Sequence, residues 1–214
     1  VSHNIPSVTR LCERAILVHQ GKIVLDGEAD FVAARYLRMG RKTAAEIHWT
    51  SRDESPASDV VQLKRVRVRS VDGNTIEKVE TTDRFGIEIV FDVLIGGHVL
   101  VPNFHFFNDE GINLFVSIDI DREWKGKPRP AGRYRSIAWV PANLLAEGGV
   151  IVGVAITTFI PWRIHLYEQE AVSFQVVDTG QAPSARGYFT GSLPGVVRPL
   201  LEWETDYCNG DSSR

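Results

Sequence analysis

Three acidic side chains alternate along one short stretch of the chain, and they are the first candidates for chemistry. Asp119, Asp121 and Glu123 are each separated by one residue. Two carboxylates can hydrolyse a glycosidic bond if they flank it from two sides, and oxygen ligands at alternate positions suit calcium. Alternate residues of a strand lie on one face, about 7 Å apart, and do not flank a bond. A solvated strand end beside Arg122 and Lys125 is therefore the preferred interpretation.

The histidines and cysteines are too dispersed for a metal or disulfide framework. No H-x-x-x-H or C-x-x-C spacing occurs among the later histidines, which are His48, His98, His105 and His165. No zinc or other metal site is therefore predicted. Cys12 and Cys208 lie near opposite ends of the chain and are expected to be two reduced thiols.

A strand-like segment carries aromatic and polar side chains that could bind sugar. Carbohydrate sites need an aromatic plate for the apolar sugar face and planar polar groups for the hydroxyls. If Phe104 and Phe106 point into a core, strand alternation turns Asn103, His105 and Phe107 outward.

Two other segments complete this predicted site. Trp139 points outward if its neighbours Ala138 and Val140 point inward. Thr157 points outward together with Gly153 and Ala155, whose small side chains would leave a shallow trough. Trp139 and His105 would wall the trough, with Asn103 and Thr157 as hydrogen-bonding groups. The predicted carbohydrate-binding residues are Trp139, His105, Asn103, Phe107 and Thr157. In the alternative interpretation Trp139 is ordinary core, because a one-residue shift in register reverses every side chain.

Other aromatic and basic residues are assigned structural roles. Trp124 and Trp162 fall in predicted loops, where Trp162 either anchors its loop or forms a binding tip, and anchoring is preferred. Trp203 is expected to be structural. A basic strand face is expected to be solvated and to protect an edge strand; it consists of Lys64, Arg65, Arg67 and Arg69.

The elements that position these residues are short strands. Alternation of apolar and polar residues marks 60–70 and 85–93. Further strands are expected at 101–107, 113–120, 134–140, 150–159 and 171–177, with one or two helical turns at 141–147. Many short strands, close turns and almost no helix favour two sheets packed face to face, a mainly β sandwich.

Bulk properties narrow the function classes. The chain has 214 residues and a formal net charge of −3, which gives no general attraction to nucleic acid. No apolar run reaches the roughly 18 residues of a membrane helix, and no signal peptide opens the chain. The sequence begins at Val1, in what reads as the middle of a longer protein.

Residues 1–40 have a mixed α/β pattern. Helices are expected at 6–13 and 29–38 around a hairpin formed by 15–18 and 23–25. The stretch contains, in order, Ser2-His3, Leu11-Cys12-Glu13-Arg14-Ala15, Gly21-Lys22-Ile23-Val24 and Asp26-Gly27. With these motifs it resembles the C-terminal end of an ABC transporter ATPase domain. The resemblance implies that His3 is the switch histidine, which senses the γ-phosphate of ATP. Residues 41–58 are polar and are expected to form a linker, with a short strand at 47–49.

The phosphate-binding parts of an ATPase are absent from this sequence. No G-x-x-x-x-G-K-[ST] loop and no ABC signature occurs. Nothing would position ATP or magnesium, so this chain is not expected to be an enzyme and needs no cofactor. ATP and magnesium would belong to the full-length parent.

The remaining chain, 59–206, contains a series of short motifs in a fixed order. They are Val66-x-Val68 with Asp72-Gly73, Asn108-Asp109-Glu110-Gly111, Ala131-Gly132-Arg133-Tyr134, Val172-Ser173-Phe174-Gln175-Val176 and Gly195-Val196-Val197-Arg198-Pro199 with Trp203. In this order they resemble the C-terminal domain of ATPase subunits of O-antigen polysaccharide exporters, the Wzt type. The resemblance implies an immunoglobulin-like antiparallel β-sandwich that binds the exported polysaccharide, for lipopolysaccharide biosynthesis.

The resemblance also implies partners and a location. Such exporters carry two ATPase subunits, so a homodimer is expected, at the cytoplasmic face of the membrane against the transporter's membrane subunit. The segment after Gly195 could pair with the second copy as an exchanged strand, and 207–214 is expected to be a disordered tail. The main alternative is a protein-interaction module that docks onto the membrane subunit and does not touch sugar. A glycan-modifying enzyme would need converging carboxylates or a metal, which the sequence does not show.

Overall fold

The structure is a computed structural model that describes residues 8, 10–19, 21–29, 31–33, 44–51, 53–180, 184–191 and 193–206. His3 and the tail 207–214 lie outside the described residues, so their predicted roles stay predictions. Within the described ranges, no helix is long and apolar enough to cross a membrane.

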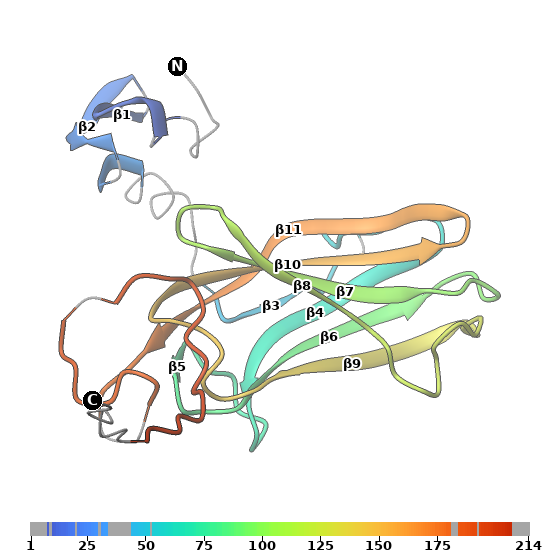
Figure 1. Ribbon diagram of the computed structural model, residues 1–214. Helices are drawn as coiled ribbons and strands as arrows, with labels where there is room; N and C mark the ends of the chain where they lie inside the picture. Colours follow the sequence, from blue (N-terminus) through green and yellow to red (C-terminus); the bar gives the residue numbers. More distant parts are fainter. Residues whose placement is uncertain are drawn as a thin grey trace, which may run out of the picture.

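Two packed sheets form the main body of the molecule (Figure 1). The five-stranded sheet has the order β5 (Lys78–Glu80), β11 (Trp162–Val177), β10 (Gly148–Phe159), β7 (Val101–Asn108) and β8 (Asn113–Ile118). The four-stranded sheet has the order β3 (Glu46–His48), β4 (Val61–Ser70), β6 (Phe85–Val93) and β9 (Gly132–Val140). All pairs are antiparallel except β5 with β11. The predicted mainly β sandwich is confirmed.

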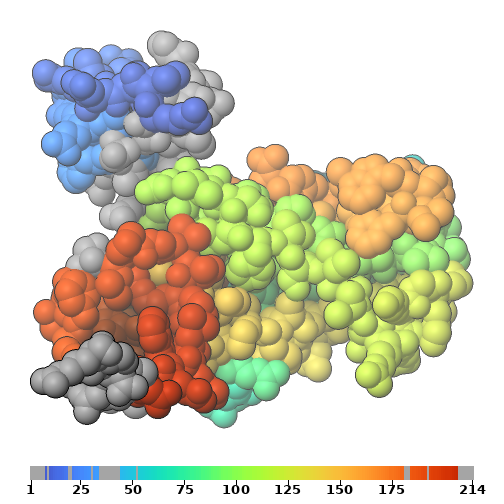
Figure 2. Space-filling model, in the orientation of Figure 1, coloured from blue at the N-terminus to red at the C-terminus, as the bar shows by residue number. Residues whose placement is uncertain are grey.

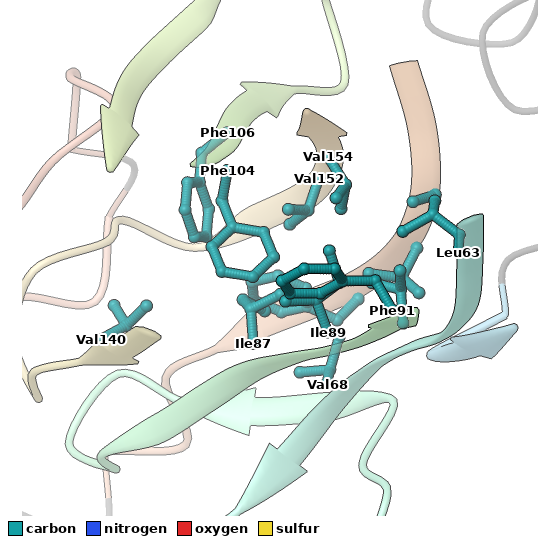
Figure 3. Packing of buried hydrophobic residues seen from close by; sticks show 14 of the residues in the cluster. Leu63, Val68, Ile87, Ile89, Phe91, Phe104, Phe106, Val140, Val152 and Val154 are labelled. Carbon is teal, nitrogen blue, oxygen red and sulfur yellow. The ribbon is translucent and has the colours of Figure 1, made fainter. Parts of the chain in front are cut away.

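The core lies between the two sheets because one face of each strand is apolar. From β6, Ile87, Ile89 and Phe91 are fully buried, and from β7 Phe104 and Phe106 meet them (Figure 3). Alternation therefore fixes which side chains of these strands face outward.

Several strand boundaries differ from the sequence-based prediction. β11 begins at Trp162 and runs for sixteen residues, although only its second half was expected. Its pairing with β10 shifts register twice, and such bulges hide the alternation that marks a strand. The predicted helical turns at 141–147 are wrong. This segment is a turn with Asn143 at a φ of 56°, followed by an isolated bridge from Leu145 to Val197.

The predicted linker 41–58 contributes to the sandwich. β3 pairs with β4 through Ile47 opposite Val66, and Ala45 is buried in the core. The backbone N–H of Trp49 donates to the carbonyl of Lys64. β4 is therefore an inner strand, and the prediction that its basic face protects an edge is wrong.

The N-terminal part contains the predicted hairpin. Among the residues that the structure describes, β1 (Arg14–His19) pairs only with β2 (Lys22–Glu28), and an ion pair between Arg14 and Asp26 joins the two strands. Leu17 of β1 is buried, whereas Ile16 and Val18 are exposed.

The described C-terminal residues follow an irregular path. Arg198 donates its backbone N–H to the carbonyl of Leu144, and its guanidinium pairs with Glu147. Beyond this contact Leu200, Leu201 and Trp203 are exposed, with Trp203 at 86%. The expectation that Trp203 has a structural role within this chain is therefore wrong.

Candidate functional site

The outer face of the five-stranded sheet brings together four of the five predicted sugar-binding residues. Asn103, His105 and Phe107 alternate along β7 with core-facing phenylalanines, so they face away from the core. On the neighbouring strand β10, Ala155 pairs with Asn103, and Gly153 pairs with His105. Thr157 follows two residues further along β10 on the same face.

A chain of hydrogen bonds orients His105. The Asn103 side-chain nitrogen donates to the Val101 carbonyl and to the Thr157 hydroxyl, both at 3.1 Å. A carbonyl can only accept, so the other amide atom, Oδ1, must face His105 Nε2 at 2.9 Å. Nε2 therefore carries the proton, and Nδ1 of the neutral ring is left as an acceptor.

Burial lowers the pKa of His105 below its ordinary value. The imidazole is therefore neutral at neutral pH, which matches the acceptor role of Nδ1. Asn103 and Thr157 are themselves only 4% and 3% exposed. These two residues cannot be the direct sugar contacts that the sequence predicted. Asn103 instead holds His105, and Thr157 accepts a hydrogen bond from Asn103.

Three rings form what we call the aromatic platform: His105, Phe107 and Tyr167. The rings of His105 and Phe107 are nearly parallel, with their centroids 6.4 Å apart. The ring centroids of His105 and Tyr167 are 5.1 Å apart. Tyr167 comes from β11, opposite Ala155, and is 39% exposed. Sequence reasoning missed Tyr167 because the first half of β11 was not recognised as a strand.

A shallow cavity adjoins the platform. Its volume is about 280 Å³, and its walls include Phe107 and Tyr167 together with Gln169 and Glu170 of β11. Beside the platform, Gly153 of β10 lies opposite His105 of β7. A Cβ at Gly153 would lie 2.7 Å from the Gln169 carbonyl oxygen, so this close strand approach requires glycine.

Trp139 lies on the opposite sheet. It points outward, as alternation predicts, but from β9, where it packs over Gly86 of β6. The guanidinium carbons of Arg69 and Arg84 lie 5.5 and 5.0 Å from its ring centroid. The prediction that Trp139 and His105 wall one trough is therefore wrong, because sequence alternation does not say which sheet a strand joins.

The basic face of β4 is organised around one carboxylate. Glu88 is fully buried and accepts hydrogen bonds from Arg65, Arg67 and Arg69 at 2.7 to 3.2 Å. Burial alone would raise the pKa of Glu88, but the hydrogen bonds and charge of the arginines lower it. This face is an ion-pair cluster rather than a simply solvated one.

The acidic stretch after β8 is held in turns. Asp119 Oδ2 accepts from the buried Arg129 at 2.8 Å, and Asp121 accepts from the backbone N–H of Glu123. The strand ends at Ile118, so these carboxylates do not share a strand face as expected. No cluster of three or more metal-ligating side chains occurs in the part of the chain that the structure describes.

Comparisons with known proteins add information on the fold. No protein-family model matches the chain, and no curated protein matches its sequence. Among solved structures, the chain is similar to the C-terminal domain of Wzt, with a TM-score of 0.56 and 12% sequence identity. The match covers 73% of this chain and 90% of that domain. The sandwich therefore has the fold of the Wzt C-terminal domain.

Proposed function

We propose that residues 59–206 bind bacterial polysaccharide of the O-antigen type as the substrate-recognition domain of an ABC exporter. The observation that carries this proposal is the aromatic platform. Its rings face outward, and one of them, the imidazole of His105, is held in a fixed orientation by Asn103. Rings of Phe107 and Tyr167 can stack on apolar sugar faces. His105 Nδ1 can accept a hydrogen bond from a sugar hydroxyl, and Gln169 borders the same cavity.

The fold supports the biological context of this proposal. A chain with the fold of the Wzt C-terminal domain fits a polysaccharide exporter, and the platform supplies a surface that sugar chemistry can use. The domain binds without catalysis. Glu170 is the one carboxylate that lines the cavity beside the platform, whereas hydrolysis needs two carboxyl groups across one bond.

The proposal extends to the rest of the complex. Residues 1–40 are the end of an ABC ATPase domain whose missing part binds ATP and magnesium. The chain works as a homodimer at the inner face of the cytoplasmic membrane, against the transporter's membrane subunit. The exposed Leu200, Leu201 and Trp203 support an exchanged segment between two copies.

Isothermal titration calorimetry with polysaccharide from the source organism tests the platform, with an unrelated polysaccharide as a specificity control. Tyr167→Ala should weaken binding of the cognate chain by about fivefold or more, since stacking on one aromatic side chain is worth about 1 kcal/mol or more. Tyr188→Ala is the matched control, because Tyr188 is fully exposed and does not line the cavity beside the platform. If the two variants bind the cognate polysaccharide with equal affinity, the platform is not part of the binding site.

A second function is favoured by one specific feature. The hairpin between β10 and β11 exposes Ile160 at 91% and Trp162 at 66%, and the Trp162 ring stacks on Phe159 with centroids 5.7 Å apart. The predicted anchoring role of Trp162 is therefore wrong. An exposed apolar tip suits docking onto a protein such as the transporter's membrane subunit. If the chain binds no polysaccharide, Trp162→Ala should weaken co-purification with that subunit.

A further inference from the structure

A second cavity lies on the open side of the sandwich, where the two sheets are not joined. Its volume is about 510 Å³, larger than the cavity beside the aromatic platform. β8 and β9 are the edge strands of their sheets and border it. Figure 2 shows these two strands on the face toward the viewer, with a hollow between the green and yellow segments. We call this cavity the edge cleft.

The wall of the edge cleft contains a fixed aromatic and guanidinium cluster. Arg129 is 2% exposed, and its guanidinium lies 5.1 Å from the ring centroids of both Trp124 and Tyr134. The Arg129 side chain also donates to the Leu100 carbonyl and to Asp119. Because each group is held by several partners, the wall is ordered before any ligand binds.

The rim of the edge cleft supplies groups that can contact a ligand. Trp139 is 36% exposed, while Arg135 and Ser136 add a cation and a hydroxyl from the same strand. Ser136 Oγ lies 3.4 Å from Asp119, which lines the opposite side. Aromatic surface together with planar and hydroxyl hydrogen-bonding groups is the chemistry of a sugar site rather than of an apolar ligand site.

The cleft is continuous with the aromatic platform across one strand. On β8, Val116 pairs with His105 and Ile118 pairs with Asn103 of β7. Val116 and Ile118 are both partly exposed, and Ile118 also lines the cleft. Adjacent strands are about 4.8 Å apart, so the way from β7 across β8 to the cleft is about 10 Å.

We propose that the edge cleft is a second subsite for the same glycan chain, entered by sugar residues that extend across β8 from the aromatic platform. This inference rests on the proposed function. A chain that fills both subsites gains affinity because the second contact is intramolecular. A fragment too short to span β8 fills only the platform, so the cleft selects long chains over short ones.

Calorimetry with two ligands from the organism's own polysaccharide tests this inference: the long chain, and the single repeat units obtained from it by hydrolysis. Trp139→Ala should weaken binding of the long chain by about tenfold or more and leave the affinity for single repeat units unchanged. Arg135→Ala, a change of an exposed side chain on the same rim, should act in the same direction. Tyr188→Ala is the control for loss of an exposed aromatic side chain elsewhere, because Tyr188 lines neither the edge cleft nor the cavity beside the platform.

The outcomes separate this inference from the proposed function. If Trp139→Ala and Arg135→Ala bind the long chain like the unaltered protein while Tyr167→Ala does not, the second subsite is overturned and the function stands. If Trp139→Ala weakens long and short ligands equally, the cleft is not a separate subsite reached only by long chains. If the unaltered protein binds neither ligand, the proposed function fails, and the inference fails with it.

Discussion

At the scale of single residues, the protonation state of His105 decides what the platform can bind. The residue is held by Asn103 through Nε2, so Nδ1 is the ring nitrogen left to accept a hydrogen bond from a ligand hydroxyl. Protonation would turn Nδ1 into a donor and place a positive charge among the rings. A site that uses the neutral imidazole must therefore lose affinity when the ring gains a proton.

The pH dependence of glycan binding follows from this state. Because burial lowers the pKa of His105, affinity should stay constant from pH 8 to about 6.5 and fall only at more acidic pH. Calorimetry across this range measures the effect, and His105→Gln, which does not titrate, should remove the pH dependence. A fall in affinity between pH 8 and 7 would contradict the assignment.

Protein stability has to be followed in the same experiment. His105 and His165 both have pKa values lowered first by burial, so the unfolded chain takes up protons before the folded chain does. Stability contributed by these neutral rings is present above about pH 6.5 and declines as pH falls below it. Thermal unfolding at each pH therefore separates loss of binding from loss of fold.

Glu88 is the residue whose replacement should cost the most stability on the opposite sheet. Glu88→Ala leaves Arg65, Arg67 and Arg69 crowded without their shared carboxylate. Loss of one partner of a buried pair costs about 3–5 kcal/mol. The arginines are partly exposed and can turn to water, so we expect about 2–3 kcal/mol in urea unfolding. Glu110→Ala, at an exposed turn, should change stability by less than about 0.5 kcal/mol.

At the scale of elements, the bulged pairing of β10 with β11 builds the floor of the platform. The first half of β11 carries Tyr167 and Gln169, and the register shift beside Gly153 brings the β11 backbone close to β10. The bulge therefore allows one long strand to supply both core residues and ligand-facing residues.

Gly153→Ala tests this role of the bulge. The added methyl group would lie 2.7 Å from a backbone oxygen that cannot rotate away, so the two strands must move apart. We expect a loss of about 1–3 kcal/mol in stability together with weaker polysaccharide binding. Gly27→Ala is the control in another strand, because its new methyl group would meet only ordinary contacts at 3.9 Å and beyond. Unchanged stability in Gly153→Ala would contradict the close approach of the β11 backbone to β10.

At the scale of the whole molecule, the exposed C-terminal segment is the feature on which the proposed homodimer rests. Leu200 and Leu201 are more than half exposed after a segment that is tied to the sandwich by Arg198. Apolar side chains that are adjacent and exposed in one copy become buried if two copies exchange this segment.

Sedimentation of the purified chain at micromolar concentration tests the exchange. We expect a dimer, and Leu200→Asp with Leu201→Asp should convert it to a monomer without changing the fold by circular dichroism. Ile95→Asp, at an exposed residue of a different loop, should leave the dimer intact. A monomer for the unaltered chain would overturn the homodimer proposal.

The sequence by itself determined the fold class and most strands. Alternation in β4, β6 and β7 is strong because one side of each strand lies against the core and the other faces outward. The same alternation correctly turned His105, Phe107 and Trp139 outward. These features are local, since the side-chain period of two depends only on the backbone of one strand.

Only the tertiary structure decided which outward residues share a face. Trp139 and His105 have the same local pattern but lie on different sheets, because sheet membership depends on long-range pairing that no local period records. The bulges made the first half of β11 unrecognisable as a strand in the sequence, so Tyr167 was missed. Burial excludes Asn103 and Thr157 as direct sugar contacts and leaves them to hold His105 in place. The edge cleft has the same origin: it exists because β8 and β9 end their sheets side by side without pairing, and a strand's sequence does not state its neighbours.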